Sequence, residues 1–448
     1  MKQFLRSNIL FILGVLFIAL VIKCVPLFRF GVFAFGHDFG FYRRYVVQPL
    51  VSFPNTSVPG LDHTIFLPRI FLDIVRVILR TPDATLIIGY LMLSLVSIVS
   101  VWYFAKLYLS TKKALYAVVL YVVSGVGFVL YTSFFFKEML ALPLFLGALI
   151  SFEKKRYGLA ALLGVLVILT QQTTSIILIC IIALGFVFRT IIERTISFKY
   201  IISGTGIFAT YLFLHPHIAQ KIASPPVGIF LSQSEYIVLS IPILILTVLG
   251  IRQVVITLKK QALLGASLTV VLLFVVFQLP FYNRIYAFLD LFLIIPAAFG
   301  VEYILSVITS KYKRLLPALI SALVVVAAIP LIYLEFTLTP LVDTSTQKEL
   351  TTLLSLPPNS SIITSPILLP WVQGWSLAKV YAPGNLKEPH STEDWSRYWV
   401  HQDIQFEQKF LSTFPWPLYL FIDKKEMEYY PMCRKMLSQN LFLLGTCH

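Results

Sequence analysis

Long apolar segments, separated by short polar loops, make up most of the chain. Several of them approach 20 residues, which is about the length that an α-helix needs to cross roughly 30 Å of hydrocarbon. We predict such segments at 8–25, 85–109, 114–131, 138–152, 159–170, 172–188, 200–216, 237–251, 261–279, 285–308 and 315–335. The pattern predicts a mainly α, polytopic transmembrane helix bundle with about eleven spans, one or two of them short.

The composition agrees with this pattern. Of the 448 residues, 58% are hydrophobic and 13% are charged, and the mean hydropathy is +0.84. Soluble domains contain about 45–50% apolar and about 25% charged residues, so an ordinary cytosolic enzyme and a disordered chain are excluded. The net charge of +15 does not indicate nucleic acid as a partner, because the basic residues lie mostly in short loops between apolar segments.

The distribution of lysine and arginine predicts the orientation in the membrane. If the eleven segments alternate, most basic residues fall on one side, and the short loops of the other side hold only Lys137, Lys221 and Arg284. Cytoplasmic loops are enriched in lysine and arginine. We therefore expect a multi-pass protein, in a prokaryotic plasma membrane, with its N-terminus inside and residues 336–448 outside.

Two stretches between and after the apolar segments have a different composition. Residues 27–84 form a long first external loop. Four charged residues of this loop share one helical face: Arg69, Asp73, Arg76 and Arg80. This spacing predicts an amphipathic helix that lies in the membrane interface. Residues 336–448 alternate apolar runs with turn signals, which predicts a small external α/β domain after a transmembrane domain at 1–335.

Cysteine and histidine positions give little support for a metal site. The four Cys and seven His show no spacing typical of metal ligands, so we expect no cofactor. Cys433 and Cys447 both lie near the C-terminus, and a disulfide between them requires that this end lies in an oxidising compartment.

The first external loop contains a candidate catalytic acid. Asp38 is the only acid between residues 29 and 45, and it is surrounded by His37, Tyr42, Arg43 and Arg44. It either caps a short helix or serves as a general base that nearby cations keep ionised. The arginines have two explanations. Either this long loop tolerates them because long loops do not follow the orientation rule, or they form an anion site at the outer surface.

Further polar residues lie near the outer ends of later segments. They are Lys137 and Glu138, Gln171 and Gln172, and Arg284 and Asp290. A lysine there can snorkel to the interface, and an acid can pair with a neighbouring helix. The glutamines follow an apolar segment that is too short to span, which favours a half-length helix ending in a water-filled pocket or, alternatively, a hydrogen bond between helices.

These features together resemble the GT-C superfamily, the polytopic membrane glycosyltransferases that use polyprenyl-phosphate-linked sugars, such as oligosaccharyltransferases and protein mannosyltransferases. The resemblance is carried by residues 37–43, Lys137-Glu138, Thr170-Gln171-Gln172 and Arg284. Two family features differ. The Trp-Trp-Asp motif of the oligosaccharyltransferases is absent, and the paired acids that help to hold a metal are reduced to Glu138.

The resemblance implies transfer of a sugar from a polyprenyl phosphate to an acceptor hydroxyl on a glycan, lipid or protein. Asp38 would be the base of a direct, inverting displacement. The donor phosphate would be bound by cations at four positions: Arg284, Lys137, Arg43 and Arg44. Other candidates would line the substrate pocket: His37, Tyr42, Glu138, Gln171, Gln172 and Asp290.

Two functions of other classes also fit the sequence. A flippase for lipid-linked glycans, or another transporter, would explain many spans and buried polar groups, although no repeated halves are visible. A non-catalytic scaffold of a cell-envelope complex would make Asp38 and Arg284 dispensable. Loss of sugar transfer in an Asp38→Asn variant would separate an enzyme from both alternatives.

Overall fold

The computed structural model describes residues 2–36, 38–47, 66–194, 196–215, 230–258, 261–309, 316–383, 390–400, 404–423 and 434–444. The chain forms two compact units. The first, here the helical unit, comprises 1–28, 66–68 and 90–338. The second, here the mixed unit, comprises 29–65, 69–89 and 339–448. The domain division predicted at residues 335 and 336 stays a prediction.

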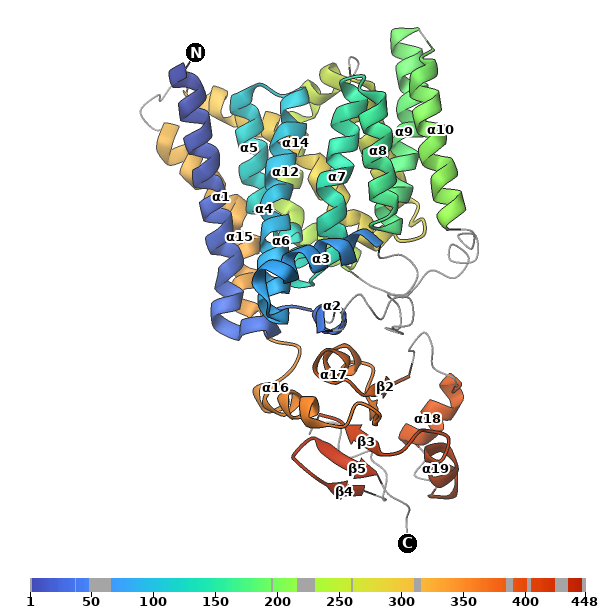
Figure 1. Ribbon diagram of the computed structural model, residues 1–448. Helices are drawn as coiled ribbons and strands as arrows, with labels where there is room; N and C mark the ends of the chain where they lie inside the picture. The colour runs from blue at the N-terminus through green and yellow to red at the C-terminus, as the bar shows by residue number, and fades with distance from the viewer. Residues whose placement is uncertain are drawn as a thin grey trace. The chain divides into compact units, whose positions relative to one another are not determined.

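The helical unit contains the long apolar helices (Figure 1). They are α1 (Lys2–Phe30), α4 (Pro82–Tyr108), α5 (Thr111–Val122), α6 (Gly125–Thr132), α7 (Phe136–Glu153), α8 (Tyr157–Ile168), α9 (Gln172–Glu193), α10 (Phe198–Leu214), α12 (Gln233–Leu258), α13 (Ala262–Val276), α14 (Tyr282–Thr309) and α15 (Leu316–Thr337). Figure 1 shows α7, α8, α9 and α10 side by side, and α8 contacts the other three. The helices α1 and α4 extend past the boundary between the units.

The most buried of the long apolar helices is α14, which packs along α12. Glycine permits their close approach. A Cβ atom at Gly300 would overlap the carbonyl oxygen of Leu246, and one at Gly250 would overlap the carbonyl oxygen of Pro296. The close contact between the two backbones therefore fixes the position of α14, and α14 carries several residues of the site described below.

The predicted membrane spans are confirmed only in part. Six described helices are long and apolar enough to cross a membrane: α1, α4, α9, α12, α14 and α15. The pair α5 and α6 is bent by 50° and counts as a seventh if it forms one span, while α8, α10 and α13 are shorter apolar helices. Every predicted apolar segment contains a helix, but the count of about eleven spans is not confirmed.

The mixed unit contains a five-stranded sheet with the order β2-β1-β3-β5-β4. Its strands are β1 (Ser361–Thr364), β2 (Lys379–Tyr381), β3 (Leu418–Phe421), β4 (Arg434–Met436) and β5 (Leu441–Leu444). The strands β2, β1 and β3 are parallel, and β5 is antiparallel to both of its neighbours. All four residues of β1 are buried, as expected for a central strand that is covered on both faces.

Short helices complete the mixed unit: η1 (Gly31–Ala34), α2 (Asp38–Val47), α3 (Phe66–Leu79, which begins in the helical unit), α16 (Thr344–Leu350), η4 (Thr351–Ser355), α17 (Leu369–Trp375), α18 (Thr392–Val400) and α19 (Ile404–Leu411). An aromatic core around Trp395, Phe410 and Phe414 holds α18 and α19 on the sheet. The predicted mixed α/β character of this part of the chain is confirmed.

Helix α2 packs closely on α17 because both carry glycine at the contact. A Cβ atom at Gly40 would overlap the carbonyl oxygen of Pro370, and one at Gly374 would lie 2.7 Å from the carbonyl oxygen of Gly40. Phe39 adds ring contacts to Trp371 and Trp375 at 6.3 Å between centroids. The position of α2, which carries Asp38, is therefore set by α17.

The predicted amphipathic helix is present as α3, with its apolar side exposed. Ile74, Val77 and Ile78 are exposed, whereas Arg69 is buried beside Asp73. Burial raises the pKa of the Asp73 carboxyl, and the positive charges of Arg69 and of Arg76 oppose this shift. An exposed apolar face is what a helix in the membrane interface requires.

Candidate active site

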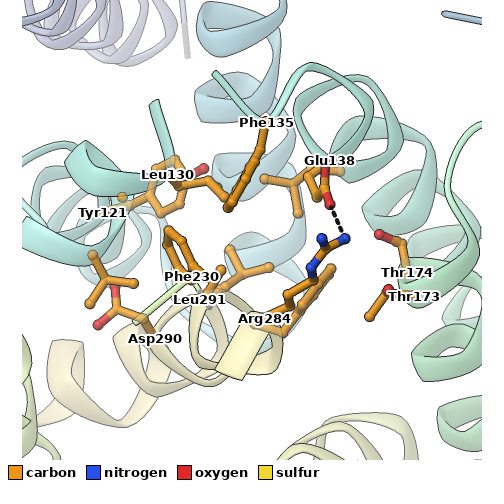
Figure 2. A pocket seen from close by; sticks show the side chains of 15 residues that line it. Tyr121, Leu130, Phe135, Glu138, Thr173, Thr174, Phe230, Arg284, Asp290 and Leu291 are labelled. Atoms are coloured by element: carbon orange, nitrogen blue, oxygen red, sulfur yellow. Dashed lines mark ion pairs between the residues drawn. The ribbon is translucent and has the colours of Figure 1, made fainter. Parts of the chain in front are cut away.

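A pocket within the helical unit brings together candidates from distant parts of the sequence (Figure 2). Its labelled lining residues are Tyr121, Leu130, Phe135, Glu138, Thr173, Thr174, Phe230, Arg284, Asp290 and Leu291. The helices α5, α6, α7, α9 and α14 contribute to it. Its cavity volume is about 30 Å³, which is more than the roughly 10–15 Å³ that one ordered water molecule requires. Most of its wall is apolar, and the charged groups are few.

Arg284 and Glu138 face each other across this pocket. Arg284 Nη1 lies 3.5 Å from Glu138 Oε1, and the two side chains are 30% and 15% exposed. The guanidinium also lies over the ring of Phe135, 5.8 Å from its centroid. Arg284 stands in the first turn of α14, where the helix dipole favours an anion. The planar fork of donors suits a phosphate group better than a lysine would.

Gln171 connects the pocket to the start of α9. Its Nε2 donates to Glu138 Oε1 at 2.7 Å, and its Oε1 accepts from the backbone N–H of Thr174 at 2.9 Å. One side chain thus caps α9 and positions the acid that pairs with Arg284. Gln172 instead lies 3.5 Å from the Tyr211 hydroxyl, and neither Gln172 nor Lys137 belongs to the pocket lining.

Asp290 lines the pocket but is buried and hydrogen-bonded. Its Oδ2 accepts from Ser124 Oγ at 2.7 Å, and its Oδ1 accepts from Ser240 Oγ at 3.3 Å. Ser124 also caps α6 by accepting from Gly127 N–H at 2.9 Å, so Asp290 anchors the bend between α5 and α6. The sequence did not point to either serine, because neither has a distinctive local pattern and both lie far from Asp290 along the chain.

The mixed unit holds the other predicted residues. Asp38 is the first residue of α2 and is partly buried, in a position where the helix dipole stabilises a carboxylate. Tyr42 is buried. His37 lies outside the described residues. Both readings of Asp38, helix cap and base, are compatible with this position.

Arg43 uses its donors within the mixed unit. Its Nε donates to Asp83 Oδ1 at 2.7 Å and its Nη1 donates to the carbonyl oxygen of Gly374 at 2.6 Å. The guanidinium also lies 4.2 Å from the centroid of Trp375. The residue is only 8% exposed. Arg43 therefore fastens α2 to α17.

Arg44 is used in a similar way. It donates to the carbonyl oxygens of Ser376 and Leu377, which follow α17. Burial lowers the pKa of Arg44 to about 10, which still leaves it charged at neutral pH. These contacts hold Arg44 against the residues that follow α17.

Comparisons with known proteins identify the fold to which this site belongs. No protein-family model and no curated protein sequence matches the chain. Solved structures do match it. AglB, the oligosaccharyltransferase of Archaeoglobus fulgidus, in complex with an inhibitory peptide and a dolichol-phosphate, is 12% identical with a TM-score of 0.66, over 93% of this chain and 70% of that one.

ArnT from Cupriavidus metallidurans, bound to undecaprenyl phosphate, is 10% identical with a TM-score of 0.60, over 97% of this chain and 98% of that one. The arabinofuranosyltransferase AftD from Mycobacteria is 12% identical with a TM-score of 0.56, over 92% of this chain and 35% of that one. All three are GT-C glycosyltransferases. The chain has the GT-C fold.

Within the GT-C fold of this chain, the candidates divide between the units. Glu138, Gln171, Arg284 and Asp290 come together in the helical unit, and Asp38 lies in the mixed unit. Among the residues that the structure describes, no group of three or more His, Cys, Asp or Glu could hold a metal ion. Cys433 and Cys447 lie outside the described residues.

Proposed function

We propose that the protein is a membrane glycosyltransferase that moves a sugar from a polyprenyl-phosphate donor to an acceptor hydroxyl. The observation that carries this proposal is the pocket in which a partly exposed arginine, Arg284, stands among apolar side chains. A ligand that combines an anionic group with a long apolar chain matches such a site. The structures of AglB with a dolichol-phosphate and of ArnT with undecaprenyl phosphate support a polyprenyl carrier.

In this proposal Arg284 binds the donor phosphate. Its guanidinium can form two parallel charge-assisted hydrogen bonds to phosphate oxygens, and the N-terminus of α14 adds a favourable dipole. As negative charge grows on the leaving phosphate, both interactions strengthen. Lys137, one residue before Glu138, is proposed as a second cation for the donor.

The reaction that we propose is a direct displacement. The acceptor oxygen attacks the anomeric carbon, the bond from that carbon to the phosphate oxygen breaks, and the polyprenyl phosphate leaves as a stable anion. Asp38 takes the proton of the acceptor hydroxyl, and a single base with a single displacement implies inversion. We propose that this chemistry occurs on the external face of the membrane, where we also place the domain at 336–448.

A transfer assay with a defined polyprenyl-phosphate sugar in detergent tests the proposal. Asp38→Asn keeps the shape of the side chain but removes its basicity. We expect it to retain its melting temperature and its donor binding while its transfer rate falls about 10²-fold or more, the usual contribution of a positioned base. Glu393→Gln changes an exposed carboxylate of the mixed unit and should transfer at the wild-type rate.

Two results would contradict the proposal. Full transfer by Asp38→Asn would exclude Asp38 as the base and leave Glu138 as the next candidate. If the wild-type protein transfers no sugar from any donor but moves a lipid-linked glycan across vesicles, the protein is a flippase and not an enzyme.

A further inference from the structure

Two further hollows lie along α9, one beside its middle and one at its C-terminal end. This helix has 22 residues, which corresponds to about 33 Å. Thr173 and Thr174 at its start line the pocket of Arg284, whereas Arg189 and Glu193 at its end line a different, charged hollow. The two sites therefore belong to opposite ends of one candidate span.

The first hollow of the pair is an apolar groove between α9 and α10. Its volume is about 390 Å³, and its lining includes Ile179, Ala183, Phe186, Gly204 and Phe208. None of the described residues that line it is charged. Phe208, on the apolar helix α10, is 46% exposed. In a bilayer this surface faces hydrocarbon, so a groove of this composition suits a flexible acyl chain.

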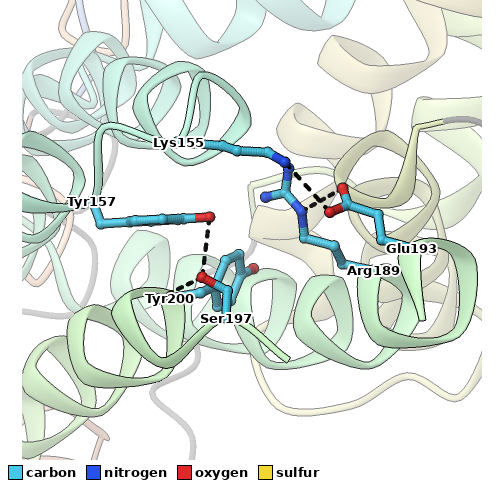
Figure 3. Close-up of polar contacts among 6 residues, drawn as sticks. All are labelled: Lys155, Tyr157, Arg189, Glu193, Ser197 and Tyr200. Atoms are coloured by element: carbon cyan, nitrogen blue, oxygen red, sulfur yellow. Dashed lines mark hydrogen bonds and ion pairs between the residues drawn. The ribbon is translucent and has the colours of Figure 1, made fainter. Parts of the chain in front are cut away.

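The second hollow is charged. Figure 3 shows two contacts of Glu193, one of its lining residues: Arg189 Nε donates to Glu193 Oε1 at 2.7 Å, and Lys155 Nζ lies 3.4 Å from Glu193 Oε2. Glu153 lines the same hollow, and its carboxylate forms no hydrogen bond or ion pair with the residues that the structure describes. The lining thus presents one guanidinium and two carboxylates.

Tyr200 joins the two hollows, because it lines both of them. Its hydroxyl donates to the carbonyl oxygen of Ile182 at 2.8 Å, and its ring contacts Phe152 and Phe186 at centroid distances of 4.9 and 5.8 Å. These contacts fix the ring between α7, α9 and α10. The apolar groove and the charged hollow are therefore neighbours that share the wall formed by Tyr200, and together they form an amphipathic surface.

We propose that a phosphatidylethanolamine molecule of the bilayer binds to this surface, with one acyl chain in the groove and its head group in the charged hollow. The charges are complementary. Arg189 offers terminal N–H groups to the lipid phosphate, and Glu153 offers its carboxylate to the ammonium. Phosphatidylcholine has no N–H donors, and phosphatidylglycerol has no cation, so both fit less well. The site is separate from the proposed donor site.

Native mass spectrometry of the delipidated full chain, titrated with the three lipids at matched acyl length, tests this proposal. We expect the wild type to bind phosphatidylethanolamine at least 10-fold more tightly than the other two. Ala183→Trp fills the groove from α9 and should weaken this binding at least 10-fold. Gly204→Leu narrows the groove from α10 and should give the same result. Ile202→Trp, at an exposed position outside the groove, is the matched control.

The head-group contact is tested separately. Glu153→Gln removes a carboxylate from the charged hollow and should reduce the preference for phosphatidylethanolamine over phosphatidylcholine to about 3-fold or less, while Glu235→Gln, an exposed acid on α12, should preserve it. Equal affinity of the wild type for all three lipids, a preference for phosphatidylglycerol, or full binding by both groove variants would each overturn the proposal.

Discussion

Two arginines, Arg284 in the helical unit and Arg43 in the mixed unit, differ in how much of their hydrogen-bonding capacity the protein itself uses. Arg43 donates to a carboxylate and to a backbone carbonyl, lies over Trp375, and is 8% exposed. Arg284 has a side chain that is 30% exposed and is paired with Glu138 at the longer distance of 3.5 Å. An arginine with satisfied donors holds elements together, whereas one that is paired loosely in a pocket is free to exchange its partner for a ligand.

Of the substitutions that test this comparison, Arg43→Met is expected to have the largest effect. It keeps the length of the side chain but removes its hydrogen-bond donors. Hydrogen bonds to charged groups contribute about 1.5–3 kcal/mol each, so the loss of two should lower the free energy of unfolding by at least about 3 kcal/mol. This corresponds to a melting temperature about 6–12 °C lower for a unit of this size. Arg80→Met, at an exposed arginine of the same unit, should melt like the wild type.

Thermal unfolding of the full chain measures the stability of the Arg43→Met variant, and titration with a polyprenyl phosphate measures its donor affinity. Donor affinity should stay within about 2-fold of the wild type once the protein is folded. A variant that melts normally but has lost donor binding would make Arg43 a phosphate ligand, and the distinction between the two arginines would fail.

Arg284→Ala is expected to show the reverse behaviour. Loss of one charge-assisted interaction, about 1.5–3 kcal/mol, should lower the affinity for polyprenyl phosphate roughly 10- to 150-fold. The melting temperature should change little, because a partly exposed ion pair contributes about 0–1 kcal/mol. Arg284→Lys should recover only part of the affinity, since the planar fork is lost. Unchanged binding in Arg284→Ala would place the phosphate elsewhere.

The smallest effect is expected from Glu138→Gln. The amide keeps an oxygen that accepts from Gln171, but it no longer competes with phosphate for Arg284. Since such a pair contributes at most about 1 kcal/mol, donor affinity should rise by up to about 5-fold in the same titration. A clear fall in affinity would mean that Glu138 positions Arg284 for the ligand and does not compete with it.

The fold was predictable where the signal is local. Each apolar segment was identified by its length and hydropathy, and the break before Gln171 by polar residues inside an apolar region. The number of spans was not predictable to the same degree, because α8, α10 and α13 are apolar but shorter than a full span. The inward face of α3 was also missed, since Arg69 is buried beside Tyr45 and Asp73, contacts that spacing alone does not reveal.

The site divides in the same way. Glu138, Gln171 and Arg284 were identified separately because each is a polar residue at the end of an apolar segment, and the structure brings them together. The contacts of Arg43 could not be foreseen, because its acceptor at Gly374 is a backbone carbonyl 331 residues away. A carbonyl leaves no mark in the sequence, so an arginine whose donors the fold uses and an arginine that we propose as a ligand-binding residue have the same sequence appearance.

The ion pair between Arg284 and Glu138 has a consequence for how tightly a donor can bind. Glu138 Oε1 lies 3.5 Å from Arg284 Nη1. A phosphate that takes both donors of the Arg284 fork displaces this carboxylate, so the form that binds the donor is the one in which the pair has separated. The apparent affinity is then the affinity of that separated form multiplied by its population. Changes that merely separate the pair would strengthen binding without adding a single contact to the lipid.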